Sequence, residues 1–270
     1  VHCADCHSAH GSASGTHSPG TNALSPALRG ATGLQLNYSA AEWTRPEYQF
    51  LPGRANYEYE ICVKCHSYWS WGNFPPTTSR RGRQTDQSIE FNPNNASYHA
   101  VIGESRAGPR GALVAPWKRD SKMYCADCHG MPRGSKGAHG STIPAMLRGT
   151  YSRSSGGSED LCSSCHSPSA YARNGNPNEP KSTGFADDRV GLNLHVTHAR
   201  IDSPLSNAPM TCMDCHVAIP HGWKRKALIA FKSDPEPYVD GAAIDDIPDW
   251  PMTGRWEFKS CATSCHTQNA

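Results

Sequence analysis

The chain contains 270 residues and has a formal net charge of +2 at pH 7. Only 37% of its residues are hydrophobic, and it has 24 glycines and 21 prolines, so its side chains alone cannot build a large apolar core. No stretch approaches the roughly 18 to 20 apolar residues of a membrane-spanning helix, so we expect no transmembrane segment. Because the first cysteine is already the third residue, we expect a mature product from which an export signal has been removed.

Six cysteine motifs follow one another along the chain, and in each the second cysteine directly precedes a histidine. The first five have the form C-x-x-C-H, the attachment signature of c-type haem, and the sixth has one more residue between its cysteines. Two thiols bond the vinyl groups of one porphyrin, and the histidine is the proximal iron ligand. We therefore predict six haem c groups, attached at Cys3 and Cys6, Cys62 and Cys65, Cys125 and Cys128, Cys162 and Cys165, Cys212 and Cys215, and Cys261 and Cys265. The predicted proximal ligands are His7, His66, His129, His166, His216 and His266.

Two other uses of twelve cysteines are disulfide bonds and zinc sites. Six disulfides would suit an exported chain, but they would not explain a histidine after every second cysteine. A zinc site needs four ligands, whereas these motifs recur singly, each with its own histidine. The spacing therefore favours haem.

Eight histidines lie outside the motifs and are the source of second axial ligands. His2 adjoins an attachment cysteine and is interpreted as a surface residue or as one that supports a haem ligand without binding the iron. The other seven are one more than six haems require: His10, His17, His99, His139, His195, His198 and His221. Methionine is an alternative axial ligand, but methionines commonly fill gaps in a core.

An internal repeat relates two of these candidates. Residues 3–17 align without a gap with residues 125–139, and both segments continue to Leu-Arg-Gly, so His17 and His139 are predicted to be equivalent distal ligands. Each repeat ends at the next motif, as in the paired C-x-x-C-H module of many multihaem cytochromes, which residues 3–66 and 125–166 resemble. The natural unit is then a pair of haems.

The remaining candidates are placed by their neighbours in the chain. His99 lies between the second and third motifs, and His221 is five residues beyond His216. That spacing is too short to reach the opposite face of the same haem, so His221 is expected to bind a neighbouring iron. His195 and His198 are three residues apart, which places them on adjacent parts of one helical face. Either one of them is a ligand, or both are and they serve different haems.

Connections rich in glycine, proline, serine and asparagine separate the motifs, and no apolar period of a long helix or strand competes with them. We predict a fold that is mostly coil, with a few short helices around the motifs and minimal sheet, wrapped around stacked haems. Residues 1–270 would form a single multihaem domain with haem pairs at about 1–70, 120–170 and 190–270. Aromatic side chains would pack on the porphyrins.

The N-terminal run C-x-x-C-H-x-x-H at residues 3–10, the six haem motifs and a last motif close to residue 270 resemble the OmcS-type hexahaem cytochromes that polymerise into extracellular nanowires. The resemblance implies that His10 ligates a haem of the next subunit in a head-to-tail filament, at the cell surface or outside the cell. The chain departs from that family in its sixth motif and in shorter connections between haems. Alternatively, His10 is an intramolecular ligand of a monomeric periplasmic carrier.

Bis-histidine ligation leaves no open iron position, so we expect outer-sphere electron transfer rather than enzymatic catalysis. The partners would be other cytochromes or extracellular electron acceptors. A multihaem reductase is a further alternative, but such enzymes often have lysine in place of the motif histidine, and no C-x-x-C-K occurs here. The small positive charge does not indicate nucleic-acid binding, because haem propionates would reverse it and pair with many of the Lys and Arg residues.

Overall fold

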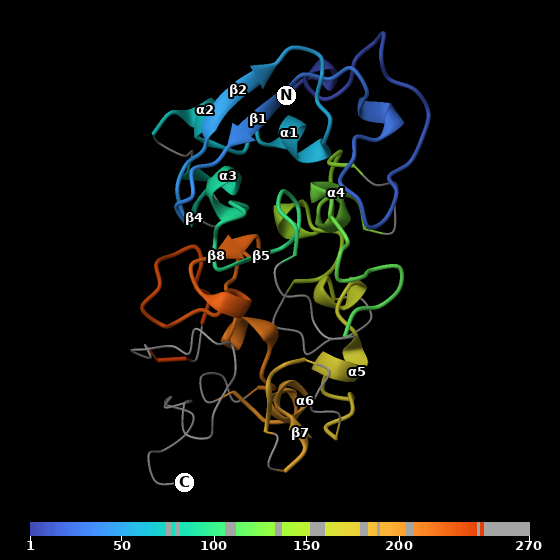
Figure 1. Ribbon diagram of the computed structural model, residues 1–270. Coiled ribbons are helices and arrows are strands. Elements are labelled where there is room, and N and C mark those ends of the chain that lie inside the picture. Colours follow the sequence, from blue (N-terminus) through green and yellow to red (C-terminus); the bar gives the residue numbers. More distant parts are fainter. Residues whose placement is uncertain are drawn as a thin grey trace. The chain divides into compact units, whose positions relative to one another are not determined.

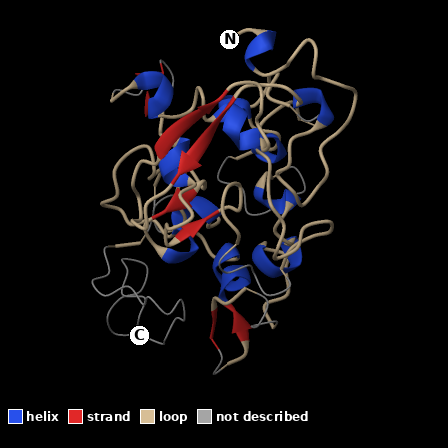
Figure 2. Ribbon diagram, turned by 45° about the horizontal axis from the view of Figure 1, so that its top comes forward, coloured by secondary structure: helices blue, strands red, loops and turns tan. Residues whose placement is uncertain are grey.

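The computed structural model describes residues 1–73, 77–78, 82–105, 112–132, 137–151, 160–178, 183–187, 190–203, 208–241 and 244–245. This part of the chain is mostly coil with short helices and small two-stranded sheets, which confirms the predicted fold class (Figure 2). The sixth motif, with Cys261, Cys265 and His266, lies outside the described residues.

Contacts divide the chain into two compact units. Unit 1 comprises Val1–Arg106, Asp120–Arg148 and His221–Lys224, and unit 2 comprises Ala107–Arg119, Gly149–Pro220 and Arg225–Ala270. The first three motifs belong to unit 1, and the fourth and fifth belong to unit 2. The single haem-wrapped domain with three haem-pair modules stays a prediction.

Unit 1 contains a hairpin of β1 (Gly33–Asn37) and β2 (Glu47–Leu51), paired antiparallel from Gly33 opposite Leu51 to Asn37 opposite Glu47. Helix α1 (Glu58–Cys62) packs against β1 (Figure 1). Leu34 and Ile61 are buried there. The other elements of the unit are α2 (Tyr68–Trp71), α3 (Gln87–Glu90), α4 (Cys125–Cys128), the strand pair β3 (Thr77–Thr78) and β4 (Gly82–Arg83), and the 3-10 turns Cys3–Asp5, Pro26–Leu28 and Pro144–Met146.

Helix α1 is fixed at its start by a carboxylate. Oε2 of Glu60 accepts hydrogen bonds from the amides of Asn56 and Tyr57, at 2.7 and 3.2 Å, which satisfies amides that a helix start leaves without intrahelical partners. The helix ends at Cys62 and contacts α4. Two attachment cysteines, Cys62 and Cys125, are therefore held on packed helices.

A second strand pair of unit 1 joins distant segments. Strand β5 (Ser97–Tyr98) pairs antiparallel with β8 (Gly222–Trp223). The side chain of Trp223 is fully buried, with its ring edge against Trp43 at 5.1 Å. Beyond the paired residues, the amide of His99 donates to the carbonyl of His221 at 2.9 Å. The pairing of β5 with β8 thus places two candidate ligands, His99 and His221, side by side.

Unit 2 is built around α5 (Pro168–Tyr171) and α6 (Leu194–Ala199), which pack on each other, with the strand pair β6 (Ala186–Asp187) and β7 (Leu192–Asn193). The fully buried Asn193 begins α6, because its Oδ1 accepts from the amide of His195 at 3.0 Å and its Nδ2 donates to the carbonyl of Ala170 at 2.8 Å. Helix α6 carries both His195 and His198. The 3-10 turns of the unit are Cys162–Ser164, Cys212–Asp214 and Lys226–Leu228.

None of the helices in the described ranges has the length and apolar character of a membrane span.

Candidate haem sites

All five described motifs adopt the same backbone turn. In each, the amide of the motif histidine donates to the carbonyl of the first cysteine, at 2.8 Å for His7, 3.1 Å for His66, 2.9 Å for His129, 2.8 Å for His166 and 2.9 Å for His216. Two thiols and an imidazole are thereby gathered within a single turn of chain. The ten described cysteines carry free thiols, so both sulfurs of each turn are available for thioether bonds.

A carboxylate caps most of these turns. Asp5, Asp127 and Asp214 each accept a hydrogen bond from the amide of the residue before the first cysteine, at 2.6, 2.9 and 2.6 Å. In the fourth motif Asp160 accepts from the amide of Cys162 at 3.0 Å. Negative charge at the start of a helical turn is favourable, and the hydrogen bond from His2 lowers the pKa of Asp5. Sequence reasoning missed this role, although the shared Asp of C-A-D-C-H and C-M-D-C-H was its signal.

Three motif histidines are oriented by backbone carbonyls. Nδ1 of His7 donates to Ala27 at 2.8 Å, Nδ1 of His129 to Ala145 at 2.9 Å, and Nδ1 of His216 to Ala227 at 2.7 Å. When Nδ1 carries the proton, Nε2 keeps the lone pair that binds a metal. The rings therefore have the tautomer of an axial ligand.

The three acceptor alanines all lie on 3-10 turns, Pro26–Leu28, Pro144–Met146 and Lys226–Leu228. The first two turns belong to the repeat that was found in the sequence, whereas the third reveals the same arrangement after the fifth motif. The third turn lacks the Leu-Arg-Gly sequence that accompanies the first two, so the repeat in the sequence did not reveal it. The shared element is structural.

Three motif histidines each face a histidine from outside the motifs. The ring centroids are 5.9 Å apart for His7 and His139, 6.0 Å for His129 and His221, and 6.4 Å for His195 and His216. Two imidazoles that bind one iron from opposite sides have centroids about 6 Å apart, because metal–imidazole bonds are about 2 Å long. The three centroid separations fit three bis-histidine haems.

Two of the facing histidines are also held through Nδ1. Nδ1 of His195 contacts Oγ1 of Thr183 at 2.9 Å, and Nδ1 of His221 contacts Oε2 of Glu90 at 2.6 Å. Both rings therefore keep Nε2 for a metal, like the motif histidines opposite them.

Burial keeps several of these rings neutral. It lowers the pKa of His129 to about 4, with nearby His221 adding to the effect, and lowers the pKa of His195 to about 3, with His216 adding to it. The pKa of His66 is also lowered, by burial and then by His221. Neutral imidazole is the form that binds a metal, so these sites are prepared for coordination at neutral pH.

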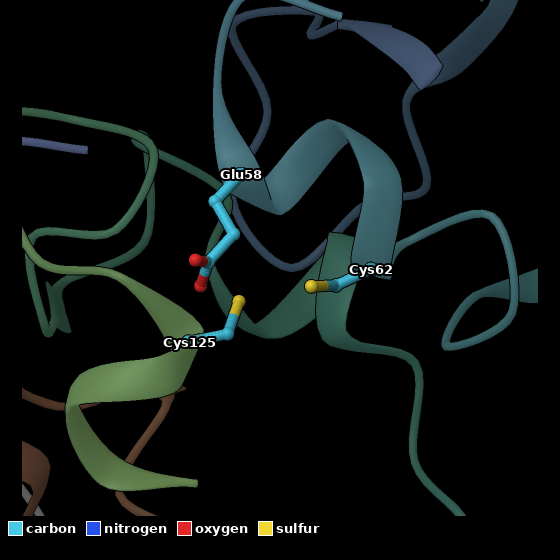
Figure 3. Close-up of side chains that lie close together, drawn as sticks. All are labelled: Glu58, Cys62 and Cys125. Atoms are coloured by element: carbon cyan, nitrogen blue, oxygen red, sulfur yellow. The ribbon is translucent and has the colours of Figure 1, made fainter. Parts of the chain in front are cut away.

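Cysteines of successive motifs lie close together within each unit. In unit 1 the Sγ atoms of Cys62 and Cys125 and a carboxylate oxygen of Glu58 lie within 4.8 Å of one another (Figure 3). A hydrogen bond with Cys125, together with burial, raises the pKa of Cys62. In unit 2 a hydrogen bond with Cys212, together with burial, raises the pKa of Cys162.

The cluster of Glu58, Cys62 and Cys125 could by its donor atoms also hold a metal ion. Both cysteines, however, are the first cysteines of intact C-x-x-C-H turns, and Oε1 of Glu58 accepts the amide of Ala126 at 2.9 Å. Thioether bonds would convert both thiols into weak ligands, so the cluster fits haem attachment at the second and third motifs better than it fits a metal ion.

The other distal candidates have different surroundings. His10 is exposed and forms no hydrogen bond, ion pair or ring contact within the described part of the chain. His17 is bound through Nε2 to Glu58, and its ring lies edge-on to Tyr124 at 4.2 Å. Nδ1 of His198 donates to the carbonyl of Leu194 at 2.7 Å. These histidines, like His99, stay predicted ligands.

The comparisons with known proteins support the haem motifs. Residues 115–171 match the family model described as a doubled CXXCH motif, and this range contains the third and fourth motifs. No curated protein and no solved structure matches the chain. Covalently bound c-type haem at such motifs is the property of multihaem c-type cytochromes, and the match suggests an electron-transfer protein. The more specific resemblance to OmcS-type cytochromes stays a prediction.

Proposed function

We propose that the chain carries six bis-histidine c-type haems and moves electrons over long distances as the repeating subunit of an extracellular filament. The observation that supports it best is the set of three histidine pairs at 5.9 to 6.4 Å. Each pair joins a motif histidine to a histidine from outside the motifs, as the two axial ligands of one iron would be. When bound, haem would supply a one-electron iron couple that is closed to substrates.

The residues of the chain have separate tasks in this proposal. The cysteine pairs attach the porphyrins, and the aspartate caps hold the turns that present the cysteines. Carbonyls of Ala27, Ala145 and Ala227 fix three proximal rings through Nδ1. Burial keeps His129 and His195 neutral and therefore able to bind iron.

His99 would serve a neighbouring iron. Its amide is bonded to the carbonyl of His221, and His221 is close enough to His66 to affect its pKa. The attachment cysteines of the second and third motifs lie together as well. We therefore assign His221 to the third haem, opposite His129, and His99 to the second haem, opposite His66.

The filament part of the proposal concerns His10. An intermolecular ligand must be exposed and uncommitted, and His10 meets both conditions within the described residues. A ligand that reaches the next subunit makes a heterologous contact, which builds an open fibre when its rotation does not close a ring.

Replacing His10 by alanine tests this role. We expect His10→Ala to abolish filaments in negative-stain micrographs while all haems stay attached. His2→Ala is the matched control, because His2 is also exposed and belongs to the same N-terminal segment. Filaments that persist in His10→Ala would remove the junction role, and a monodisperse small particle for the unmodified protein would favour the monomeric carrier.

Intact mass and visible spectra test the haem part. Six haem equivalents and the sharp α-band of low-spin cytochrome are expected. Prompt carbon monoxide binding to the reduced protein at one haem would instead favour a reductase, because it requires an open iron position.

A further inference from the structure

We propose that Glu90 is a positioning residue that tunes the third haem, by holding Nδ1 of its axial ligand His221 with a buried carboxylate. This inference rests on the proposed function, because it takes His129 and His221 as the two ligands of one iron. It would make the midpoint potential of the third haem differ from those of the other haems.

The contact between the two side chains is short and protected from water. Nδ1 of His221 and Oε2 of Glu90 are 2.6 Å apart, and the Glu90 side chain is fully buried while that of His221 is 22% exposed. Charge-assisted hydrogen bonds are stronger than neutral ones and gain further in a low-dielectric interior. Glu90 is therefore placed to act on His221 and not on solvent.

The backbone around this contact leaves little freedom. Glu90 is the last residue of α3, and its carbonyl accepts from Nδ2 of Asn95 at 2.8 Å. A Cβ added to Gly222 would lie 1.8 Å from that same carbonyl oxygen, so β8 can approach α3 this closely only with glycine. The next residue, Trp223, is fully buried. The segment that carries His221 is therefore held in close contact with Glu90.

Four of the other five paired ligands have neutral partners at Nδ1. His7, His129 and His216 donate to backbone carbonyls, and His195 contacts a threonine hydroxyl. A carboxylate at the second ring nitrogen makes an imidazole a more basic ligand, and stronger donation favours oxidised iron. The third haem should therefore be harder to reduce than the other two haems whose pairs are described.

A second buried carboxylate in unit 1 supplies a control. Asp86 is the N-cap of α3, where its Oδ1 accepts from the amides of Ser88 and Ile89 at 2.8 and 3.3 Å, and asparagine caps a helix about as well as aspartate does. Asp86→Asn removes the same charge as Glu90→Gln, from the start of the same helix. It separates the effect of a lost charge from the effect on one ligand.

The test is Glu90→Gln in the haem-loaded protein, followed by potentiometric titration and electron paramagnetic resonance of the oxidised form. We expect one haem to shift to a higher midpoint potential and one low-spin ferric signal to change its g values, with every haem still attached. Asp86→Asn should leave that signal unchanged. Unchanged potentials and signals in Glu90→Gln, or a shared shift of several haems with no change in g values, would overturn the role of Glu90.

The unmodified protein gives an independent reading if Glu90→Gln fails to load haem. His221→Ala identifies the low-spin signal of the third haem by its loss, and in the unmodified protein that signal should persist to lower potentials than the signal lost in His195→Ala. If the signal of the third haem instead disappears at higher potentials than the signal lost in His195→Ala, the proposal is also overturned. If His221→Ala removes no low-spin signal, the ligand assignment itself is wrong, which separates failure of the proposed function from failure of the role of Glu90.

Discussion

The histidine pairs of the two units differ in how many residues of the chain separate the two members of a pair. In unit 1, His7 faces His139 and His129 faces His221, so both pairs join segments that are distant in sequence. In unit 2, His195 faces His216, and both belong to neighbouring segments. In unit 1 the histidine opposite a motif histidine therefore comes from a distant part of the chain. In unit 2 it comes from a segment close to the motif.

The largest effect should come from removing a haem from each unit. Cys125→Ser with Cys128→Ser, and Cys212→Ser with Cys215→Ser, should each lower the intact mass by one haem. Cys125→Ser with Cys128→Ser should destabilise the protein by roughly 1 kcal/mol more than Cys212→Ser with Cys215→Ser. The reason is that the haem lost in the first variant would close the longer loop, between His129 and His221, and the haem lost in the second would close the shorter loop, between His195 and His216. Equal denaturation midpoints for the two variants would contradict this difference between the units.

A smaller effect is expected when a distal ligand alone is removed. His221→Ala and His195→Ala should retain all haems, and each reduced protein should bind one equivalent of carbon monoxide, because one iron loses an axial ligand. Visible spectroscopy measures this uptake, with His2→Ala as the control that should bind none. If neither variant binds carbon monoxide, the two histidines are not axial ligands in either unit.

The smallest effect concerns the caps of the motif turns. Asp127→Ala should cost about 1 kcal/mol of stability, the usual value of a lost cap. Asp214→Ala should cost about 2 kcal/mol, because Asp214 is buried and its second oxygen also accepts from Oγ of Ser203 at 2.9 Å, which would be left without this partner. Denaturant unfolding of the loaded proteins measures both, and a larger loss for Asp127→Ala would reverse the order.

The repeat in the sequence predicted equivalent roles for His17 and His139, and the structure gives them different neighbours. His139 lies opposite His7, whereas His17 contacts Glu58 and Tyr124. Equivalent positions in a repeat share local conformation, but their neighbours come from other segments. This is why the repeat identified candidate ligands without identifying their partners.

The sequence by itself determined the coil-rich fold class, and it predicted the attachment cysteines and the proximal histidines. These follow from residues that are adjacent in the chain, since C-x-x-C-H is one turn and a glycine- and proline-rich composition disfavours long elements. Only the tertiary structure decided which histidines face one another and that a buried carboxylate holds His221. A histidine pair is a contact between separate segments of the chain, and spacing along the chain carries no information about which of those segments meet.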